Sequence, residues 1–307
     1  MILATPYTNV GAVDWDDLAR EMDFCHRCGV QGVVWPQGSS GVAHLTKEER
    51  LQGMEVLAKA AQGKTPALVL GVQGKDTAEM VEYARHAERL APDAMIAMPP
   101  SGARSLDEYW EYFRALAKVT SRPVIVQTTG GAPTLTPPVE LIVGLARELP
   151  NFGYVKEESA PLVERMRAEL QHRPPMKAIF GAAFGLNWLY EMRLGLDGII
   201  TGNAMYADVM TQLWDLHERH QPERLRDAFS KFLLMRNLSD QIPGTDLYIM
   251  HRRGIFKTLA TRTTAAAGSA AGPTWSLRKF TFSPDEIAEI EYRFAALKPY
   301  LSVPTSL

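Results

Sequence analysis

Short apolar segments alternate with helical segments along the first two thirds of this chain, and this alternation limits the folds that it can adopt. The apolar segments are rich in Val, Ile and Leu and nearly free of charged residues. We expect strands at residues 2–6, 32–35, 66–70, 94–97, 123–126, 154–155, 178–180 and 198–200. Strands that are apolar throughout are typical of a parallel sheet with both faces covered, in which the intervening helices form the crossovers.

Eight such units predict an α/β protein, a (β/α)8 TIM barrel followed by a C-terminal helical extension. Two helix starts carry the spacing of a capping box: Thr46 with Glu49 in the alternating part of the chain, and Ser283 with Glu286 at the last predicted helix. After residue 203 the rhythm stops, and from about residue 210 we expect helices without a strand of comparable strength. The barrel and its active site are therefore placed in residues 1–210, and the helical region in 211–307. The small-residue run at 261–272 predicts a flexible linker or a lid.

Composition argues against several classes of partner. The net charge of −2 and the pI near 6.4 argue against nucleic acid or an anionic membrane surface. No apolar run approaches the roughly 20 residues that a membrane span needs. Cys25 and Cys28 form a CxxC pair inside a helical pattern, and without a second pair we interpret them as buried helix residues. We expect a cytoplasmic protein.

Barrel enzymes carry their chemistry at the C-terminal ends of the strands, so the residues that follow each predicted strand define the expected site. These residues comprise one lysine, one carboxylate and many small hydrogen-bonding groups. The substrate-binding set that we predict is Pro6, Ser39, Ser40, Gly41, Thr128, Thr201 and Gly202. Because no His or carboxylate cluster occurs among them, we expect no metal. Because no GxxxxGK[ST] or GxGxxG element follows a strand, we also expect no nucleotide cofactor.

The stretch from Gly153 to Ser159 carries the lysine. A strand has a period of two, so Lys156 and Glu158 point the same way and Glu157 points the other way. An amine beside a carboxylate at the mouth of an apolar barrel is suited to act as a nucleophile with its own proton acceptor. The alternatives are a solvated charge cluster at a strand end, or a Glu158 that only sets the charge of Lys156. The loop 38–41 can hold a carboxylate with its amides and hydroxyls, or it is a plain turn.

The chain resembles the dihydrodipicolinate synthase/N-acetylneuraminate lyase family, class I aldolase-like barrels that form a Schiff base with a 2-keto acid. The resemblance covers nearly the whole chain. Its motifs are Thr5-Pro-Tyr7, Gly38-Ser-Ser-Gly41 with Leu45-Thr-Lys-Glu-Glu-Arg50, Met98-Pro-Pro100, Pro123-Val-Ile-Val126, Lys156-Glu157 and Gly198-Ile-Ile-Thr-Gly-Asn203. The resemblance implies that Lys156 is the Schiff-base lysine, that Ser39 and Ser40 hold the substrate carboxylate, and that the enzyme is a homo-oligomer, a tetramer or a dimer.

Three positions depart from the family pattern. Gln127 stands where the family usually has a proton-shuttling tyrosine, and Ser101 stands where an aromatic residue usually reaches a neighbouring subunit. Glu158 stands where a small residue is usual. A glutamine cannot titrate, so it can orient a group but cannot exchange protons. In Gln127 and Glu158 the chain is similar to the 2-keto-3-deoxy-L-arabonate dehydratases of the family, as it is in the Met98-Pro-Pro100 segment and the closing helix at Ser283-Pro-Asp-Glu286.

The resemblance implies a mechanism in which Lys156 forms an imine and Glu158 acts first as base and then as acid. Gln127, with Thr128 or Thr129, holds the hydroxyl or the water. The expected activity is dehydration of a 2-keto-3-deoxy sugar acid. Three alternatives stay open: a pyruvate-dependent aldolase or synthase, a deaminating enzyme, and a non-catalytic barrel that binds a keto acid. Synthesis of dihydrodipicolinate itself is the least expected, because it depends on the tyrosine.

Overall fold

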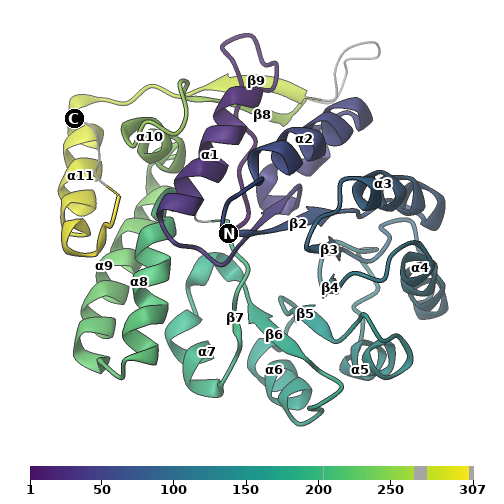
Figure 1. Ribbon diagram of the computed structural model, residues 1–307. Coiled ribbons are helices and arrows are strands. Elements are labelled where there is room, and N and C mark those ends of the chain that lie inside the picture. Colours follow the sequence, from purple (N-terminus) through teal and green to yellow (C-terminus); the bar gives the residue numbers. More distant parts are fainter. Residues whose placement is uncertain (203, 266–274, 304–307) are drawn as a thin grey trace. The chain divides into compact units, whose positions relative to one another are not determined.

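The computed structural model describes residues 1–202, 204–265 and 275–303 (Figure 1). The chain divides into two compact units. We call residues 1–2, 32–38 and 67–202 the barrel unit. We call residues 3–31, 39–66 and the part of the chain after residue 202 the helical unit.

Seven strands in the described part of the barrel unit form one parallel sheet in chain order (Figure 1). They are β1 (Gly32–Trp35), β2 (Ala67–Gly71), β3 (Ala94–Ala97), β4 (Val124–Gln127), β5 (Tyr154–Lys156), β6 (Ala178–Gly181) and β7 (Gly198–Ile199). The residues before β1 complete the ring, because Ile2 forms a parallel bridge with Val34 and its N–H donates to the carbonyl of Thr201 at 2.8 Å. The fold is therefore the expected TIM barrel.

Helices on the outside of the curved sheet connect these strands (Figure 1). They are α3 (Thr77–Arg89), α4 (Leu106–Val119), α5 (Val139–Glu148), α6 (Leu162–Leu170) and α7 (Trp188–Leu194). The sequence placed α3, α4 and α6 to within a residue or two, because side-chain caps mark two of them. Asp76 accepts from the N–H of Glu79, and Ser105 accepts from that of Glu108.

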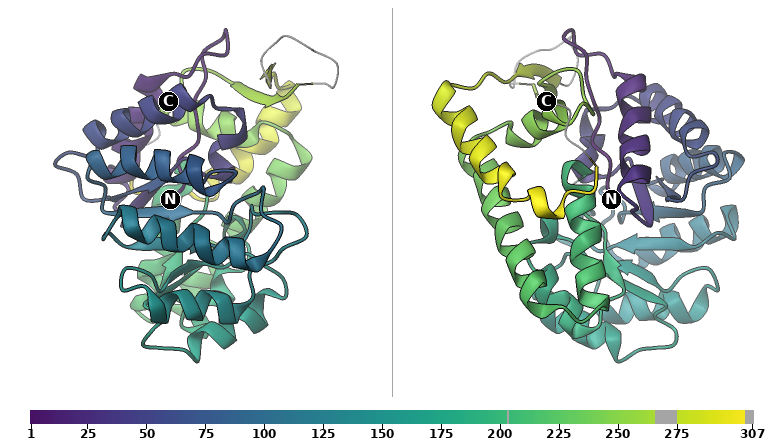
Figure 2. Two further views of the ribbon diagram at one scale, coloured as in Figure 1. Left: turned by 90° about the vertical axis from the view of Figure 1, so that its right-hand side faces the viewer. Right: turned by 60° about the vertical axis from the view of Figure 1, so that its left-hand side comes forward.

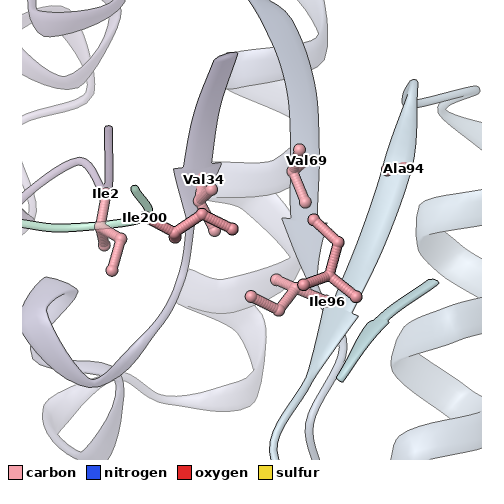
Figure 3. Packing of buried hydrophobic residues seen from close by; sticks show 7 residues of the cluster. Ile2, Val34, Val69, Ala94, Ile96 and Ile200 are labelled. Atoms are coloured by element: carbon pink, nitrogen blue, oxygen red, sulfur yellow. The ribbon is translucent and has the colours of Figure 1, made fainter. Parts of the chain in front are cut away.

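Buried apolar side chains from neighbouring strands and from the residues beside them fill the barrel interior (Figure 3). The cluster comprises Ile2, Val34, Val69, Ala94, Ile96, Ile125 and Ile200, with Tyr154 and Phe180 packed against it. Because side chains on a strand alternate, the residues two positions after Ile125 and Tyr154 also face the interior. The core thereby directs Gln127 and Lys156 into the mouth of the barrel.

The helical unit contains the remaining helices. They are α1 (Trp15–Arg27), α2 (Lys47–Ala60), α8 (Ala207–Glu218), α9 (Pro222–Gln241), α10 (Thr245–Arg252) and α11 (Pro284–Ala295). Helices α8, α9 and α11 lie side by side (Figure 2). Both predicted capping boxes are present, at Thr46 and at Ser283. Cys25 and Cys28 are buried and unpaired, as the helical pattern predicted.

Two sequence predictions were wrong. The strand expected at 2–6 is reduced to the bridge at Ile2, because the N–H of Ala4 donates to the carboxylate of Glu21 at 3.0 Å and Pro6 has no N–H. The C-terminal region also contains an antiparallel hairpin, β8 (Ala260–Thr264) with β9 (Trp275–Lys279). The predicted linker at 261–272 thus begins as a strand, and its part from 266 onward lies outside the described residues.

The described helices include none that is both long and apolar enough to cross a membrane.

Candidate active site

Gln127 and Lys156 are register partners at the ends of β4 and β5. Both side chains are buried, and the Nζ of Lys156 donates to the Oε1 of Gln127 at 3.2 Å. On the other side, the same Nζ lies 3.1 Å from the Oε1 of Glu158. Lys156 and Glu158 therefore share one face, as the period of two predicted.

Thr129 completes a closed ring of four side chains. Its hydroxyl donates to the Oε2 of Glu158 at 2.7 Å and accepts from the Nε2 of Gln127 at 3.2 Å. Each of the four side chains therefore contacts two others in the order Lys156, Gln127, Thr129, Glu158. The ring fixes the amide orientation of Gln127 and leaves neither oxygen of Glu158 without a partner. A preorganised arrangement of this kind holds its groups in place before a substrate arrives.

Burial sets the protonation of the lysine. The side chain of Lys156 is 5% exposed, and desolvation lowers its pKa from the ordinary value for lysine, while the charge of Glu158 opposes that shift. A lowered pKa increases the fraction of neutral amine, which is the nucleophilic form. Glu158 keeps 23% of its side chain exposed, so it can reach both the amine and a bound molecule.

The sequence assigned Thr128 to substrate binding, but its hydroxyl already donates one hydrogen bond and accepts another within the protein. The hydroxyl donates to the Oε1 of Glu157 at 2.6 Å and accepts from the N–H of Glu158 at 2.9 Å. Because Gln127 faces the interior, the next residue faces away from it and the residue after that faces inward. The structure thus places the hydroxyl of Thr129 beside Glu158, and that of Thr128 behind it.

The loop that was expected to bind a carboxylate lies in the helical unit from Ser39 onward. The hydroxyl of Ser40 donates to the carbonyl of Leu3 at 2.6 Å, and the carbonyl of Ser40 accepts from the hydroxyl of Thr5 at 2.6 Å. Ser39 is exposed. Gly41 has a φ of 74°, a left-handed conformation that favours glycine. The carbonyl of Pro6 accepts from the N–H of Asp14 at 3.0 Å.

Thr201 and Gly202 follow β7 in the barrel unit. Thr201 is 2% exposed, and its hydroxyl has no hydrogen-bond partner in the described part of the chain. Its carbonyl accepts from Ile2 at the closure of the barrel. Among the described residues, no hydrogen bond or ion pair joins these two residues to the ring of four, so their role in substrate binding stays a prediction.

Sequence reasoning missed a group of buried ionisable side chains on the outer side of β5 and β6. Glu157 contacts Arg165 on α6, and Glu169 is buried beside them. Glu191 on α7 packs against Gly181, where an added Cβ would lie 1.9 Å from its Oε2. The period of two pointed Glu157 away from the site, but no local pattern marks which helix residues meet it. Among the described residues, no group of His, Cys, Asp or Glu is arranged to hold a metal ion.

Comparisons with known proteins agree with this fold. A 4-hydroxy-tetrahydrodipicolinate synthase from Chlorobaculum parvum is 30% identical over 258 residues, which is 82% of this chain and 86% of that protein. A solved dihydrodipicolinate synthase from Rhodopseudomonas palustris superposes with a TM-score of 0.79 at 19% identity, over 96% of this chain and 97% of that one. N-acetylneuraminate lyase from Proteus mirabilis gives 0.77 at 18% identity, over 98% of both chains. The model of the dihydrodipicolinate synthetase family matches residues 1–225, and the chain therefore belongs to this family.

Proposed function

We propose that this protein is a Schiff-base hydro-lyase that removes water from a 2-keto-3-deoxy sugar acid of the 2-keto-3-deoxy-L-arabonate type. Its family comprises lyases of the class I aldolase type. The observation that carries the finer proposal is the closed ring of Lys156, Gln127, Thr129 and Glu158. In this ring the group that can exchange protons beside the amine is a carboxylate, and the neighbouring strand supplies an amide.

The proposed reaction begins when the neutral amine of Lys156 attacks the keto carbon, C2. Loss of that oxygen as water gives an imine, whose protonated nitrogen acidifies the hydrogens on C3. Glu158 takes one of these hydrogens, and the electron pair of the C3–H bond forms the enamine. Glu158 is within reach because its Oε1 lies 3.1 Å from the lysine nitrogen.

The second half of the proposed reaction breaks the bond between C4 and its hydroxyl. The enamine pushes its electrons toward C4, and the protonated Glu158 returns its proton to the departing oxygen, which leaves as water. Hydrolysis of the imine then consumes one water and frees Lys156. The net change is loss of one water from the substrate, and the unsaturated keto acid rearranges to a semialdehyde.

Gln127 and Thr129 have positioning roles in this scheme. The carboxamide of Gln127 cannot take up or release a proton, so it accepts from the lysine and donates to Thr129 without joining the proton transfers. The hydroxyl of Thr129 holds the Oε2 of Glu158, which leaves Oε1 turned toward the amine. One carboxylate oxygen is thus fixed and the other is available for the transfer.

The second candidate function is an aldolase or synthase that uses or releases pyruvate. The names of the relatives favour it, because they are synthases and a lyase of carbon–carbon bonds. Gln127 counts against it, because the family's usual tyrosine at this position is the proton shuttle. A deaminating enzyme and a non-catalytic keto-acid-binding barrel are the remaining alternatives.

The test is borohydride trapping with 2-keto-3-deoxy-L-arabonate, followed by intact mass, peptide mapping and product analysis in a parallel sample. We expect an adduct on Lys156 and a semialdehyde product. An adduct with pyruvate released would move the function to an aldolase. No adduct with this substrate or with pyruvate would overturn the Schiff-base mechanism. Lys156→Arg is the matched control, since it keeps the charge and removes the primary amine.

The proposal retains the backbone amides of Ser39, Ser40 and Gly41 and the hydroxyl of Ser39 as the groups that bind the substrate carboxylate, because the one hydrogen of the Ser40 hydroxyl goes to the carbonyl of Leu3. Pro6, Thr201 and Gly202 are further contacts. It also retains a cytoplasmic homo-oligomer with a barrel at 1–210 and a C-terminal region at 211–307. Ser39→Ala is the direct test, because loss of a carboxylate ligand raises KM more than it lowers kcat. An unchanged KM would remove Ser39 from the site.

A further inference from the structure

A buried carboxylate lies directly behind the lysine. Glu157 is 0% exposed and follows directly after β5, which ends at Lys156. By alternation its side chain points to the opposite face. Its Oε1 accepts from the hydroxyl of Thr128 at 2.6 Å and from the N–H of Ser159 at 2.6 Å. Its Oε2 lies 2.9 Å from the Nη2 of Arg165. A buried charge is tolerated only when it is paired and hydrogen-bonded, and these contacts meet that requirement.

Glu169 adds a proton to this cluster. It is 0% exposed, and neither of its oxygens has a hydrogen-bond donor of ordinary geometry among the described residues. Burial, together with the adjacent carboxylate of Glu157, raises the pKa of Glu169 to about 10, although Arg165 acts in the opposite direction. Glu169 is therefore a neutral acid at pH 7, which leaves one negative charge on Glu157 to balance Arg165.

Thr128 connects this cluster to the active site. Its hydroxyl hydrogen points to Glu157, so its oxygen is free to accept from the backbone N–H of Glu158 at 2.9 Å. A hydroxyl has one hydrogen, and Glu157 fixes where that hydrogen goes. The hydroxyl of Ser159 donates to the carbonyl of Thr128 at 3.2 Å and holds the same turn from the other side. The position of Glu158 after the end of β5 thus depends on a hydrogen bond that Glu157 orients.

We propose that Glu157 is a positioning residue, which acts through the hydroxyl of Thr128 to hold the backbone of Glu158 where its carboxylate meets the C3 hydrogen of the imine. This inference rests on the proposed role of Glu158 as the acid/base. In this proposal, groups on the outer face of the sheet at β5 support the proton transfer without contacting the substrate. It also reassigns Thr128 from substrate binding to positioning.

Substitution at Thr128 tests the connection with little change in packing. Thr128→Val keeps the shape and removes the hydroxyl, and Thr128→Ser restores the hydroxyl. Thr120 is the matched control, because its buried hydroxyl also donates to a glutamate, Glu88 at 2.7 Å, and accepts from a backbone N–H, that of Arg122 at 3.1 Å. Thr120 precedes β4 and Thr128 follows it, so Thr120→Val removes an equivalent hydroxyl at the other end of the strand.

Two readouts with pyruvate as the probe separate binding from proton transfer. Borohydride trapping reports imine formation at Lys156, and exchange of the methyl hydrogens of pyruvate for deuterium reports removal of the proton next to the imine. We expect Thr128→Val to trap pyruvate like the wild-type protein and to exchange it about tenfold to a hundredfold more slowly, since small misplacements of reacting groups have effects of this size. Thr128→Ser and Thr120→Val should exchange at close to the wild-type rate.

Every other outcome overturns either the positioning role of Glu157 or the proposed function. Wild-type exchange in Thr128→Val would overturn the positioning role. Equal loss of trapping and exchange would also overturn it, because the hydroxyl would then bind substrate or support the fold. If the wild-type protein traps pyruvate but Thr128→Val behaves like Thr120→Val, the positioning role fails and the proposed function stands. If the wild-type protein traps neither pyruvate nor 2-keto-3-deoxy-L-arabonate, the proposed function itself fails.

Discussion

The amine of Lys156 lies 3.1 Å from the carboxylate of Glu158, and the two side chains differ sharply in exposure, at 5% and 23%. In the proposed mechanism, the buried partner must lose its charge to react, and the more exposed partner must exchange protons. Desolvation lowers the pKa of Lys156, whereas the charge of Glu158 raises it. The reactivity of the lysine therefore depends on the balance of these two effects.

Replacement of Glu158 by Gln should shift imine formation to lower pH. The substitution removes the negative charge that favours protonated Lys156, so the pKa of the lysine falls further and more amine is neutral at a given pH. The initial rate of reductive trapping of pyruvate, measured against pH, checks this. A profile that moves to higher pH or does not move would contradict it.

The same substitution should remove most of the turnover. A glutamine cannot act as base or acid, and loss of such a group costs about a hundredfold to ten-thousandfold in rate. We expect Glu158→Gln to retain imine trapping while kcat falls by this factor. Glu164→Gln is the control, because Glu164 is an exposed carboxylate in the first turn of α6. Full turnover in Glu158→Gln would assign the proton transfers to another group.

The architecture and the pairing of Lys156 with Glu158 were predictable because they follow from local rules. Apolar runs marked the strands, and the period of two placed Lys156 and Glu158 on one face. The same rule, continued for two residues beyond β4, distinguishes Thr128 from Thr129, since Gln127 faces inward. The sequence prediction did not apply it there. It left either threonine open as the partner of Gln127 and named Thr128 for substrate binding.

The remaining features depend on contacts between distant parts of the chain. The hairpin of β8 and β9 was missed because its first strand begins a run of small residues. Arg262 in β8 pairs with Glu49 at 2.6 Å, and its guanidinium lies 4.7 Å from the ring centroid of Tyr7 and 4.1 Å from that of Trp275. No local periodicity reports such long-range partners, nor the meeting of Glu157 with Arg165 and Glu169.

Arg262→Lys should destabilise the protein despite the retained charge. Lysine cannot reproduce the paired hydrogen bonds to Glu49 at 2.6 and 2.7 Å or the stacking between two rings. We expect a loss of about 2 kcal/mol in the free energy of unfolding, measured with urea. Arg278→Lys is the control, because Arg278 is exposed on β9. Equal effects of the two substitutions would show that the buried contacts of Arg262 contribute no more to the free energy of unfolding than those of an exposed arginine.

Glu191→Gln should flatten the dependence of stability on pH in the acidic range. Glu191 is 2% exposed, both of its oxygens lack partners among the described residues, and burial raises its pKa from 4.5 to about 7. The raised value favours the folded state at low pH, and that contribution is lost as pH rises from about 4.5 to about 7.

The loss from Glu191 amounts to about 3 kcal/mol across this range. Urea unfolding at several pH values should show that the free energy of unfolding of the variant rises relative to that of the wild-type protein between about pH 5 and about pH 7. Above this range, the difference between the two free energies should be constant. A difference that does not change with pH would mean that Glu191 has an ordinary pKa in the folded state.

Glu169→Gln should differ from Glu191→Gln in the pH up to which the variant keeps gaining stability relative to the wild-type protein. Because the pKa of Glu169 is raised from 4.5 to about 10, the folded protein keeps this proton while the unfolded chain releases it. The wild-type protein therefore continues to lose stability relative to the variant above pH 7, where Glu191 no longer contributes. The charged groups that face Glu169 are Glu157 and Arg165.

The expected slope for Glu169→Gln is about 1.4 kcal/mol per pH unit in favour of the variant between about pH 7.5 and about pH 9. Other groups that titrate in this range are present in both proteins, so they cancel in the difference. Glu164→Gln should give no slope, because that carboxylate is exposed. If the difference for Glu169→Gln is flat, Glu169 is already ionised in the folded protein, and the cluster behind Lys156 carries a second negative charge that the neutral-acid assignment excludes.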